Sequence, residues 1–189
     1  MGVRPDHWIE RLARQEGMIE PFESSLASQG LISFGISSYG YDFRLSDNYK
    51  LPRGEASTLL DPKNLPAEFF SDHRADHVII PPNSFLLGHS LEYFRIPRNV
   101  LAICTGKSTY ARCGLLVNVT PFEPEWEGHA TISLSNTGAW PLKIYSGEGI
   151  AQLVFLAADE LCQTSYADRK GKYQAQRGIV LPRIKGSQD

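Results

Sequence analysis

The 189-residue sequence lacks several features that define whole classes of protein. It has no apolar run approaching the roughly 20 residues that a membrane-spanning helix needs. Residues 1–19 lack the apolar core of a secretory signal. The cysteines have no C-x-x-C spacing, which argues against a disulfide framework or a zinc knuckle. We therefore expect a cytoplasmic protein that has no membrane partner.

An excess of positive charge is also missing. The chain carries 19 Lys and Arg residues against 21 Asp and Glu residues, for a formal net charge of -2. With no basic surplus to neutralise a phosphate backbone, we expect no nucleic-acid partner. The hydrophobic fraction of 42% is ordinary for a soluble globular chain. The length predicts a single domain over residues 1–189 with short appendages.

What the sequence does contain is a succession of short β-rich segments separated by Gly, Pro, Asn and Asp. Before them, apolar residues recur at helical spacing from Trp8 to Ala13. This spacing predicts an amphipathic helix over residues 5–17, within an N-terminal segment 1–20, and we expect Gly17 to end it. The expected strands lie at residues 31–36, 42–45, 77–81, 84–90, 100–106, 115–121, 130–136, 142–146 and 151–157.

Strands and turns should dominate the fold, because 12 prolines and 16 glycines suit many turns better than many helices. One brief helix is expected over residues 108–114, closed by Gly114. The pattern indicates a mainly β fold: a distorted barrel or jelly-roll-like sandwich with few helical turns. Residues 166–189 form a polar tail. Such a tail is either a frayed terminus or a lid that orders over a ligand.

The clearest chemical signal lies in residues 106–137. Lys107 and Arg112 supply positive charge and fork-shaped donors, which suit phosphate oxygens. Ser108 and Thr109 add hydroxyl donors. The cluster lacks the G-x-x-x-x-G-K-[ST] spacing of a P-loop, so on its own it is also compatible with a solvated basic turn.

Two features near this cluster have more than one interpretation. Arg112 either contacts phosphate or water, or forms a structural ion pair with Glu123 or Glu125. The basic residues of the tail would ordinarily form a solvated charge run. The residues alone leave these alternatives open.

A polar and an apolar face are expected on the strand that ends this stretch. Side chains alternate across a strand, so Thr131, Ser133 and Ser135 should share one face. Ile132 and Leu134 should share the other. The polar face is therefore the one that would point toward a ligand.

Most of the chain resembles the dCTP deaminases, relatives of the trimeric dUTPases. The resemblance implies the distorted β-barrel of the dUTPase superfamily, assembled as a homotrimer with sites between subunits. It also implies a pyrimidine deoxynucleoside triphosphate as the ligand. Besides residues 106–137, the blocks that carry it are SSYGYDFRL (37–45), DPKN (61–64), PPNSF (81–85), EYFRIPR (92–98), EGIAQLVF (148–155) and GKYQAQRG (171–178).

The resemblance also implies roles for individual residues. Ser108, Arg112 and Ser133 are the candidate catalytic positions. Magnesium would bridge the phosphate oxygens, with no direct protein ligand. The implied nucleotide contacts are Lys107, Ser108, Thr109 and Arg112 at the triphosphate, Glu123 at the sugar, Thr131 at the base, Gln152 at the base or sugar, and Tyr166, Lys172 and Gln176 from the tail.

One position departs from the family's motif T-L-E-F-S-N-T, because Ser133 stands where the motif has glutamate. Deamination of cytosine needs water to attack C4, a proton to leave that water and a proton to reach the departing amine. A carboxylate can make both transfers, whereas a serine hydroxyl is a poor base near neutrality. The H-x-E and P-C-x-x-C elements of zinc deaminases are absent, so we expect no zinc.

Three functions remain open. The first is a hydrolase of dCTP-type nucleotides, acting either as a deaminase with a substitute proton shuttle or as a diphosphatase. In the diphosphatase, Glu123 and magnesium would activate water. The second is a nucleotide-binding paralogue without turnover. The third is an enzyme for another pyrimidine nucleotide, which the small Ser133 side chain would admit.

Overall fold

The structure, a computed structural model, describes residues 2–53, 59–66 and 68–184. Residue 1 of the predicted N-terminal segment and residues 185–189 of the predicted tail lie outside the described residues. In chain order the elements are β1 (Gly2–Val3), α1 (Asp6–Glu16), β2 (Ile19–Glu20), β3 (Gly35–Ser37), β4 (Gly40–Arg44), β5 (Asn48–Pro52), β6 (Phe70–Arg74), β7 (His77–Ile80), β8 (Phe85–Arg95), β9 (Val100–Gly106), α2 (Ser108–Ala111), β10 (Leu115–Asn118), β11 (Glu127–Asn136), β12 (Leu142–Tyr145) and β13 (Gly149–Ala157).

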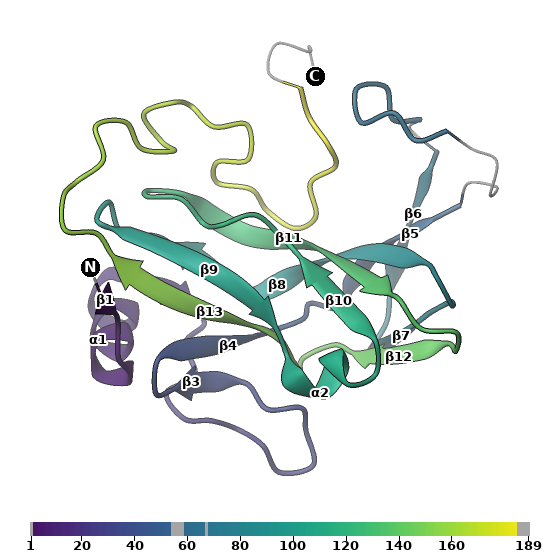
Figure 1. Cartoon of the computed structure of the whole chain (residues 1–189), viewed down its shortest axis with the longest axis horizontal. Coiled ribbons are helices and arrows are strands. Elements are labelled where there is room, and N and C mark those ends of the chain that lie inside the picture. Colours follow the sequence, from purple (N-terminus) through teal and green to yellow (C-terminus); the bar gives the residue numbers. More distant parts are fainter. Residues whose placement is uncertain (1, 54–58, 67, 185–189) are drawn as a thin grey trace.

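The described strands form antiparallel sheets (Figure 1). In the first sheet the order is β1-β13-β4-β3, with β9 also paired to β13. In the second it is β10-β11-β8-β5-β6, with β2 also paired to β8, and β12 with β7 forms a small third sheet. The prediction of a mainly β, distorted fold is confirmed. Among the described strands, however, no sheet closes on itself, so the arrangement is a set of packed open sheets.

The larger sheets share a hydrophobic core, because their strands turn alternate side chains inward. On β11, Ile132 and Leu134 are fully buried. Thr131, Ser133 and Ser135 lie on the other face and are partly exposed. The alternation that the sequence predicted for this strand is therefore confirmed, and it decides which side chains of β11 are available to a ligand.

A buried polar contact joins the two larger sheets near this core. The carboxylate of Glu92, on β8, is completely buried and accepts a hydrogen bond of 2.7 Å from Nε of Arg44, on β4. The backbone N–H of Arg44 donates to the same carboxylate at 2.9 Å. Burial raises the pKa of Glu92, and the positive charge of Arg44 opposes that rise. Beside this pair, the rings of Phe43 and Phe94 meet edge-on with centroids 5.8 Å apart.

Helix α1 confirms the predicted N-terminal helix. It buries Ile9, Leu12 and Ala13 against the core, as their helical spacing requires. Gly17 ends it with a φ of 65°, a left-handed conformation that glycine adopts without steric cost. The brief helix expected over residues 108–114 is present but shorter, because α2 ends at Ala111 with Arg112 as its C-cap. Gly114 does not close the helix; with a φ of 85° it turns the chain toward β10. No described helix is long and apolar enough to span a membrane.

Four short strands have no clear signal in the sequence. Strands β1 and β2 have two residues each, which is too short for a periodic pattern. In β5, NYKLP, only Tyr49 and Leu51 alternate with polar residues before a proline, and in β6, FSDHR, the one apolar residue is Phe70. They form by pairing with strands elsewhere in the chain: β13 pairs with β1, β8 pairs with β2 and β5, and β5 in turn pairs with β6.

We predict that Leu134→Ala lowers the free energy of unfolding by about 2–5 kcal/mol, because it leaves a cavity beneath β11. Ser135→Ala, on the other face of the same strand, should change it by less than about 1 kcal/mol. Urea unfolding of the full chain measures both. Equal losses in the two variants would contradict the assignment of the faces.

Candidate functional site

A cavity of about 300 Å³ lies against the polar face of β11. One wall is made by Ala130, Thr131 and Ser133 of β11 with Leu87 of β8. The segment 118–123, which begins at the last residue of β10, forms a second wall together with Trp126. The third wall comes from the C-terminal tail through Tyr166, Tyr173, Gln176, Val180 and Pro182. The lining is mostly apolar and aromatic, which suits the flat face of a nucleobase.

The position of Ser133 in this cavity follows from strand register. Ser133 is paired with Asn118 of β10 on one side and with Leu87 of β8 on the other. Its hydroxyl group therefore lies in the middle of the cavity wall, between an amide side chain and an apolar one. Ser133 and Asn118 offer donors and acceptors for an uncharged polar group, and neither is an effective proton shuttle near neutral pH.

The tail is held against β11 by hydrogen bonds to Thr131. The Thr131 hydroxyl accepts from the backbone N–H of Val180 at 3.0 Å and from Nε2 of Gln176 at 3.3 Å. The Gln176 carbonyl accepts from the backbone N–H of His129 at 3.1 Å. A Cβ at Gly128 would lie 2.9 Å from the Gln176 side chain, so only glycine permits this close approach. The tail thus extends along β11 and lines one side of the cavity, and its described residues, 166–184, are here named the lid segment, or lid.

Aromatic residues fix a second part of the lid. The indole N–H of Trp126 donates to the Tyr173 carbonyl at 2.9 Å, and the Tyr173 N–H donates to the Tyr166 hydroxyl at 3.1 Å. The Tyr166 N–H donates to the carbonyl of Pro124 at 3.0 Å. Burial raises the pKa of Tyr166, which keeps its hydroxyl protonated at neutral pH.

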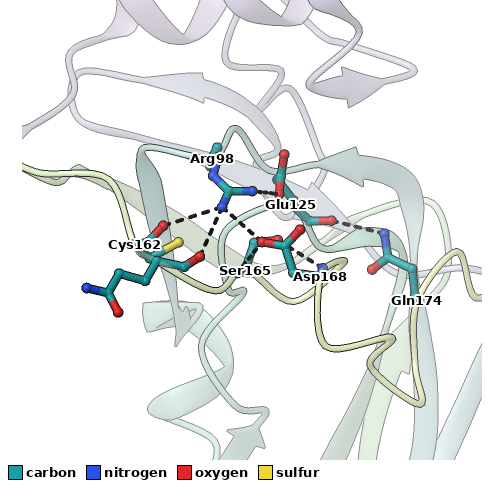
Figure 2. A network of polar contacts seen from close by, with 7 residues as sticks. Arg98, Glu125, Cys162, Ser165, Asp168 and Gln174 are labelled. Atoms are coloured by element: carbon teal, nitrogen blue, oxygen red, sulfur yellow. Dashed lines mark hydrogen bonds and ion pairs between the residues drawn. The ribbon is translucent and has the colours of Figure 1, made fainter.

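Of the described side chains that line the cavity, the one with a carboxylate is Glu123. It forms an ion pair with Arg169 of the tail. Glu125 pairs instead with Arg98, at 2.6 Å (Figure 2). The alternative in which Arg112 forms an ion pair with Glu123 or Glu125 is therefore wrong for this structure. The Arg112 guanidinium donates to the carbonyl of Ser108 at 2.8 Å.

The remaining residues of the predicted phosphate cluster lie away from this cavity. Nζ of Lys107 is 2.5 Å from a carboxylate oxygen of Asp42, and the two side chains are only 12% and 6% exposed. Strand β9, which leads into α2, pairs with β13 in the first sheet, whereas the cavity lies on β11 in the second. Lys107, Ser108, Thr109 and Arg112 are accordingly absent from the cavity lining of this chain.

Two further predicted contacts also lie elsewhere. Nε2 of Gln152, on β13, donates to the Ser37 hydroxyl at 3.1 Å. Nζ of Lys172 donates to the carbonyl of Arg183 within the tail, at 2.6 Å. Of the predicted site residues, Glu123, Thr131, Ser133, Tyr166 and Gln176 are therefore brought together around one cavity, and the others are not.

Comparison with known proteins identifies the family of this chain. A family model described as dCTP deaminase-like matches residues 3–158. The chain belongs to the dCTP deaminase-like family. Among its relatives, a protein named dCTP deaminase from Nitrosomonas eutropha is 57% identical over 188 residues, which is 97% of this chain and 100% of the relative. One from Cupriavidus metallidurans is 56% identical over 187 residues, with the same coverage.

A solved structure agrees with this assignment at the level of the fold. The crystal structure of 2'-deoxycytidine 5'-triphosphate deaminase from Agrobacterium tumefaciens superposes with a TM-score of 0.64 at 14% identity. The match covers 83% of this chain but only 48% of that longer chain. In this member of the dCTP deaminase-like family, the cavity wall carries Ser133 at the centre of β11.

Sequence reasoning missed part of the cavity lining. Asn118 and Leu87 border Ser133 only because β10 and β8 pair with β11, and nothing local in the sequence indicates that pairing. Val180 and Pro182 had a usable signal, since they belong to a short apolar run in an otherwise polar tail. Because apolar side chains are usually buried, an apolar run in a polar tail indicates that this part of the tail packs against the rest of the protein.

A pair of histidines lies beside the lid. The rings of His89 and His129 are 5.3 Å apart, and Nδ1 of each lies within hydrogen-bond distance of the Ser90 carbonyl, at 2.8 and 3.2 Å. Burial lowers the pKa of both imidazoles, and the positive charge of Arg177 lowers that of His129 further. The folded protein therefore favours both rings neutral.

We predict that this pair makes the protein less stable in mild acid. Because each folded-state pKa is depressed, the stabilisation is complete above the ordinary histidine pKa of about 6.5 and is lost as the pH falls below it. The double variant His89→Gln, His129→Gln should flatten the change in unfolding free energy between about pH 7 and about pH 5. An unchanged pH slope in a folded double variant would contradict this origin.

Proposed function

We propose that this protein binds a pyrimidine deoxynucleoside triphosphate in the β11 cavity and acts as a nucleotide hydrolase of the dCTP deaminase type. The observation that carries the proposal is the cavity wall of Thr131 and Ser133, covered by a tail that places Tyr166 and Gln176 over it. The relatives named dCTP deaminase align with both the wall and the tail, since they match 97% of the chain. The base would stack within the apolar lining and the sugar would face Glu123.

The phosphate-binding residues are proposed to come from a second copy of the chain. Lys107, Ser108, Thr109 and Arg112 carry the polyphosphate chemistry but lie outside the cavity of their own subunit. A homotrimer with sites between subunits would bring this cluster, with Gln152, to a neighbour's cavity. Ser108 and Arg112 would then contact the phosphates or the attacking water. Lys172 would replace its hydrogen bond to the Arg183 carbonyl with one to a phosphate oxygen.

The family reaction converts dCTP and water to dUTP and ammonia. Water adds to C4 of the base and loses a proton, and the amine at C4 gains a proton as it leaves. Ser133 stands at the wall position where the family motif has the glutamate that moves both protons. Among the described lining residues the carboxylate is that of Glu123, and it is paired with Arg169 of the tail. The site therefore supports binding well and proton transfer poorly.

A second candidate function follows from the same observation. A cavity with an uncharged wall at Ser133 suits a protein that binds the nucleotide without deaminating it. Glu123, released from Arg169, would in turn suit activation of water toward the α-phosphate, as in a diphosphatase. The small Ser133 side chain would also admit a pyrimidine with an additional substituent.

Magnesium is proposed to enter with the nucleotide. Among the described residues, no group of three or more His, Cys, Asp or Glu side chains is placed to hold a metal ion. Oxygen ligands from the triphosphate would satisfy the preference of Mg²⁺ for hard oxygen donors and water. The ion would reduce the negative charge that Lys107 and Arg112 must balance.

The proposal is tested by incubating the purified full chain with dCTP or dUTP, with and without magnesium, and separating the products by chromatography. Uridine triphosphate from dCTP supports deamination. Monophosphate with pyrophosphate supports the diphosphatase. Saturable binding without products supports the non-catalytic alternative, and an absence of binding to any pyrimidine triphosphate would overturn the proposal.

We predict that Ser133→Glu raises the rate of dCTP deamination by about 10²–10⁴-fold, the usual contribution of a positioned acid–base group. The new carboxylate would project into the cavity from the same strand position. Ser135→Glu is the matched control, because it adds the same charge to the same face of β11 outside the cavity lining. A folded Ser133→Glu variant that binds dCTP but gains no activity would contradict the placement of Ser133 at the base.

We predict that two variants with weakened dCTP binding complement each other when they are co-expressed, because each site is proposed to combine parts of two subunits. Arg112→Gln should remove phosphate binding, and Gln176→Ala should weaken the lid, which each lower dCTP affinity. Co-expressed chains should regain about one quarter of wild-type binding sites, since one subunit pair in four combines an intact cluster with an intact cavity. Calorimetric titration counts the sites. Assembled mixtures without recovery would show that each site lies within one chain.

A further inference from the structure

Arg98 lies in the turn between β8 and β9 and joins two segments that are distant in sequence and that each lie next to the cavity lining (Figure 2). Its Nη1 donates to Glu125 at 2.6 Å, and its Nη2 donates to Asp168 at 2.9 Å. The same Nη2 lies 3.4 Å from the carbonyl oxygens of Cys162 and Gln163. One guanidinium therefore contacts the turn before β11 and the start of the tail together.

The turn held by Arg98 is conformationally strained. Glu125 has a φ of 62°, in the left-handed region that a residue with a side chain adopts at a cost. Its backbone N–H donates to the Ile96 carbonyl at 3.0 Å, and its carbonyl accepts from Nε2 of Gln174 at 3.0 Å. With Arg98 on its carboxylate, Glu125 is fixed at three points. This turn sets the direction of Trp126, which lines the cavity.

The tail side of Arg98 is ordered in a similar way. The Asp168 carboxylate accepts from the Ser165 N–H at 3.0 Å, and the Ser165 hydroxyl accepts from the Asp168 N–H at 3.1 Å. These reciprocal bonds close a tight turn around Tyr166, which lines the cavity. The Ser165 N–H and the Arg98 guanidinium also lower the pKa of Asp168, so it stays ionised at neutral pH.

We propose that Arg98 is a positioning residue for nucleotide binding: by bridging Glu125 and Asp168, it holds the base of the tail against the turn before β11 and so preforms the lid side of the cavity. It acts through Trp126 and Tyr166 and does not itself line the cavity. A planar guanidinium can bond two carboxylates in fixed directions at once, whereas an ammonium group cannot reproduce that geometry. The nucleotide part of this inference rests on the proposed function, and the tail part does not.

The test compares variants of the full chain by amide hydrogen exchange without nucleotide and by dCTP titration. In Arg98→Gln, exchange in residues 163–176 should rise at least about tenfold, the scale expected for losing a charge-assisted hydrogen bond. The dCTP affinity should fall by a similar factor, while exchange in β8, β11 and β13 stays unchanged. Arg98→Lys should recover only part of both losses. Asp168→Asn, which leaves the Arg98–Glu125 contact in place, should reproduce the tail effect if Arg98→Gln fails to fold.

Arg14→Gln is the matched control, because it removes an arginine from another surface ion pair, with Glu10 on α1. It should leave tail exchange and dCTP affinity unchanged. The inference is overturned if the tail of Arg98→Gln or Asp168→Asn is as protected as in the wild type. It is also overturned if exchange rises equally throughout the strands, which would indicate a purely structural role. If the tail loosens but the wild type binds no dCTP, the tail part of the inference stands and the proposed function fails.

Discussion

The pairing of β11 with β10 and β8 is the constraint on which the candidate site depends. β11 is in the middle of this ladder, so its register fixes both faces at once. Burial of Ile132 and Leu134 forces Thr131 and Ser133 to the opposite face, where the cavity forms. A register shift of one residue would exchange the two faces. Because that shift would bring Ile132 and Leu134 out of the core, it is unfavourable, and the register that places Thr131 and Ser133 at the cavity is maintained. The lid depends on the same strand, because Thr131 is the anchor for Gln176 and Val180.

Charged groups near the cavity, and Lys107 of the predicted phosphate cluster away from it, are paired within one chain. Lys107 is bound to Asp42, Glu123 to Arg169, and Arg98 to both Glu125 and Asp168. Removing one partner of a buried pair costs more than the pair contributes, because the remaining charge is left without compensation. A triphosphate that engages Lys107 would therefore have to compensate for Asp42 or share the lysine with it. The Arg98 pairs are partly exposed, and their importance lies in the segments they join.

Membership of the dCTP deaminase-like family does not by itself fix the reaction. The fold provides a largely apolar cavity on the polar face of β11, with the tail along one side. Acid–base catalysis needs, in addition, a group of suitable pKa at the reacting atom. Ser133, on the cavity wall, supplies a hydroxyl group and no carboxylate. Because chemistry resides in specific side chains and binding in the whole cavity, one substitution can change the reaction and leave the fold unaltered.

The sequence by itself determined the local structure: helix α1 with its Gly17 terminus, the longer strands, and the alternation that turns Ser133 outward. These features depend on periodicity and on the conformational range of glycine, which neighbouring residues alone decide. Only the tertiary structure decided that Glu123, Ser133 and Tyr166 meet around one cavity while Lys107 lies elsewhere, bound to Asp42. Short strands such as β5, and the partners of Arg98, likewise exist only through contacts between distant segments. A local pattern carries no record of such contacts, because the chain forms them only when the sheets pack.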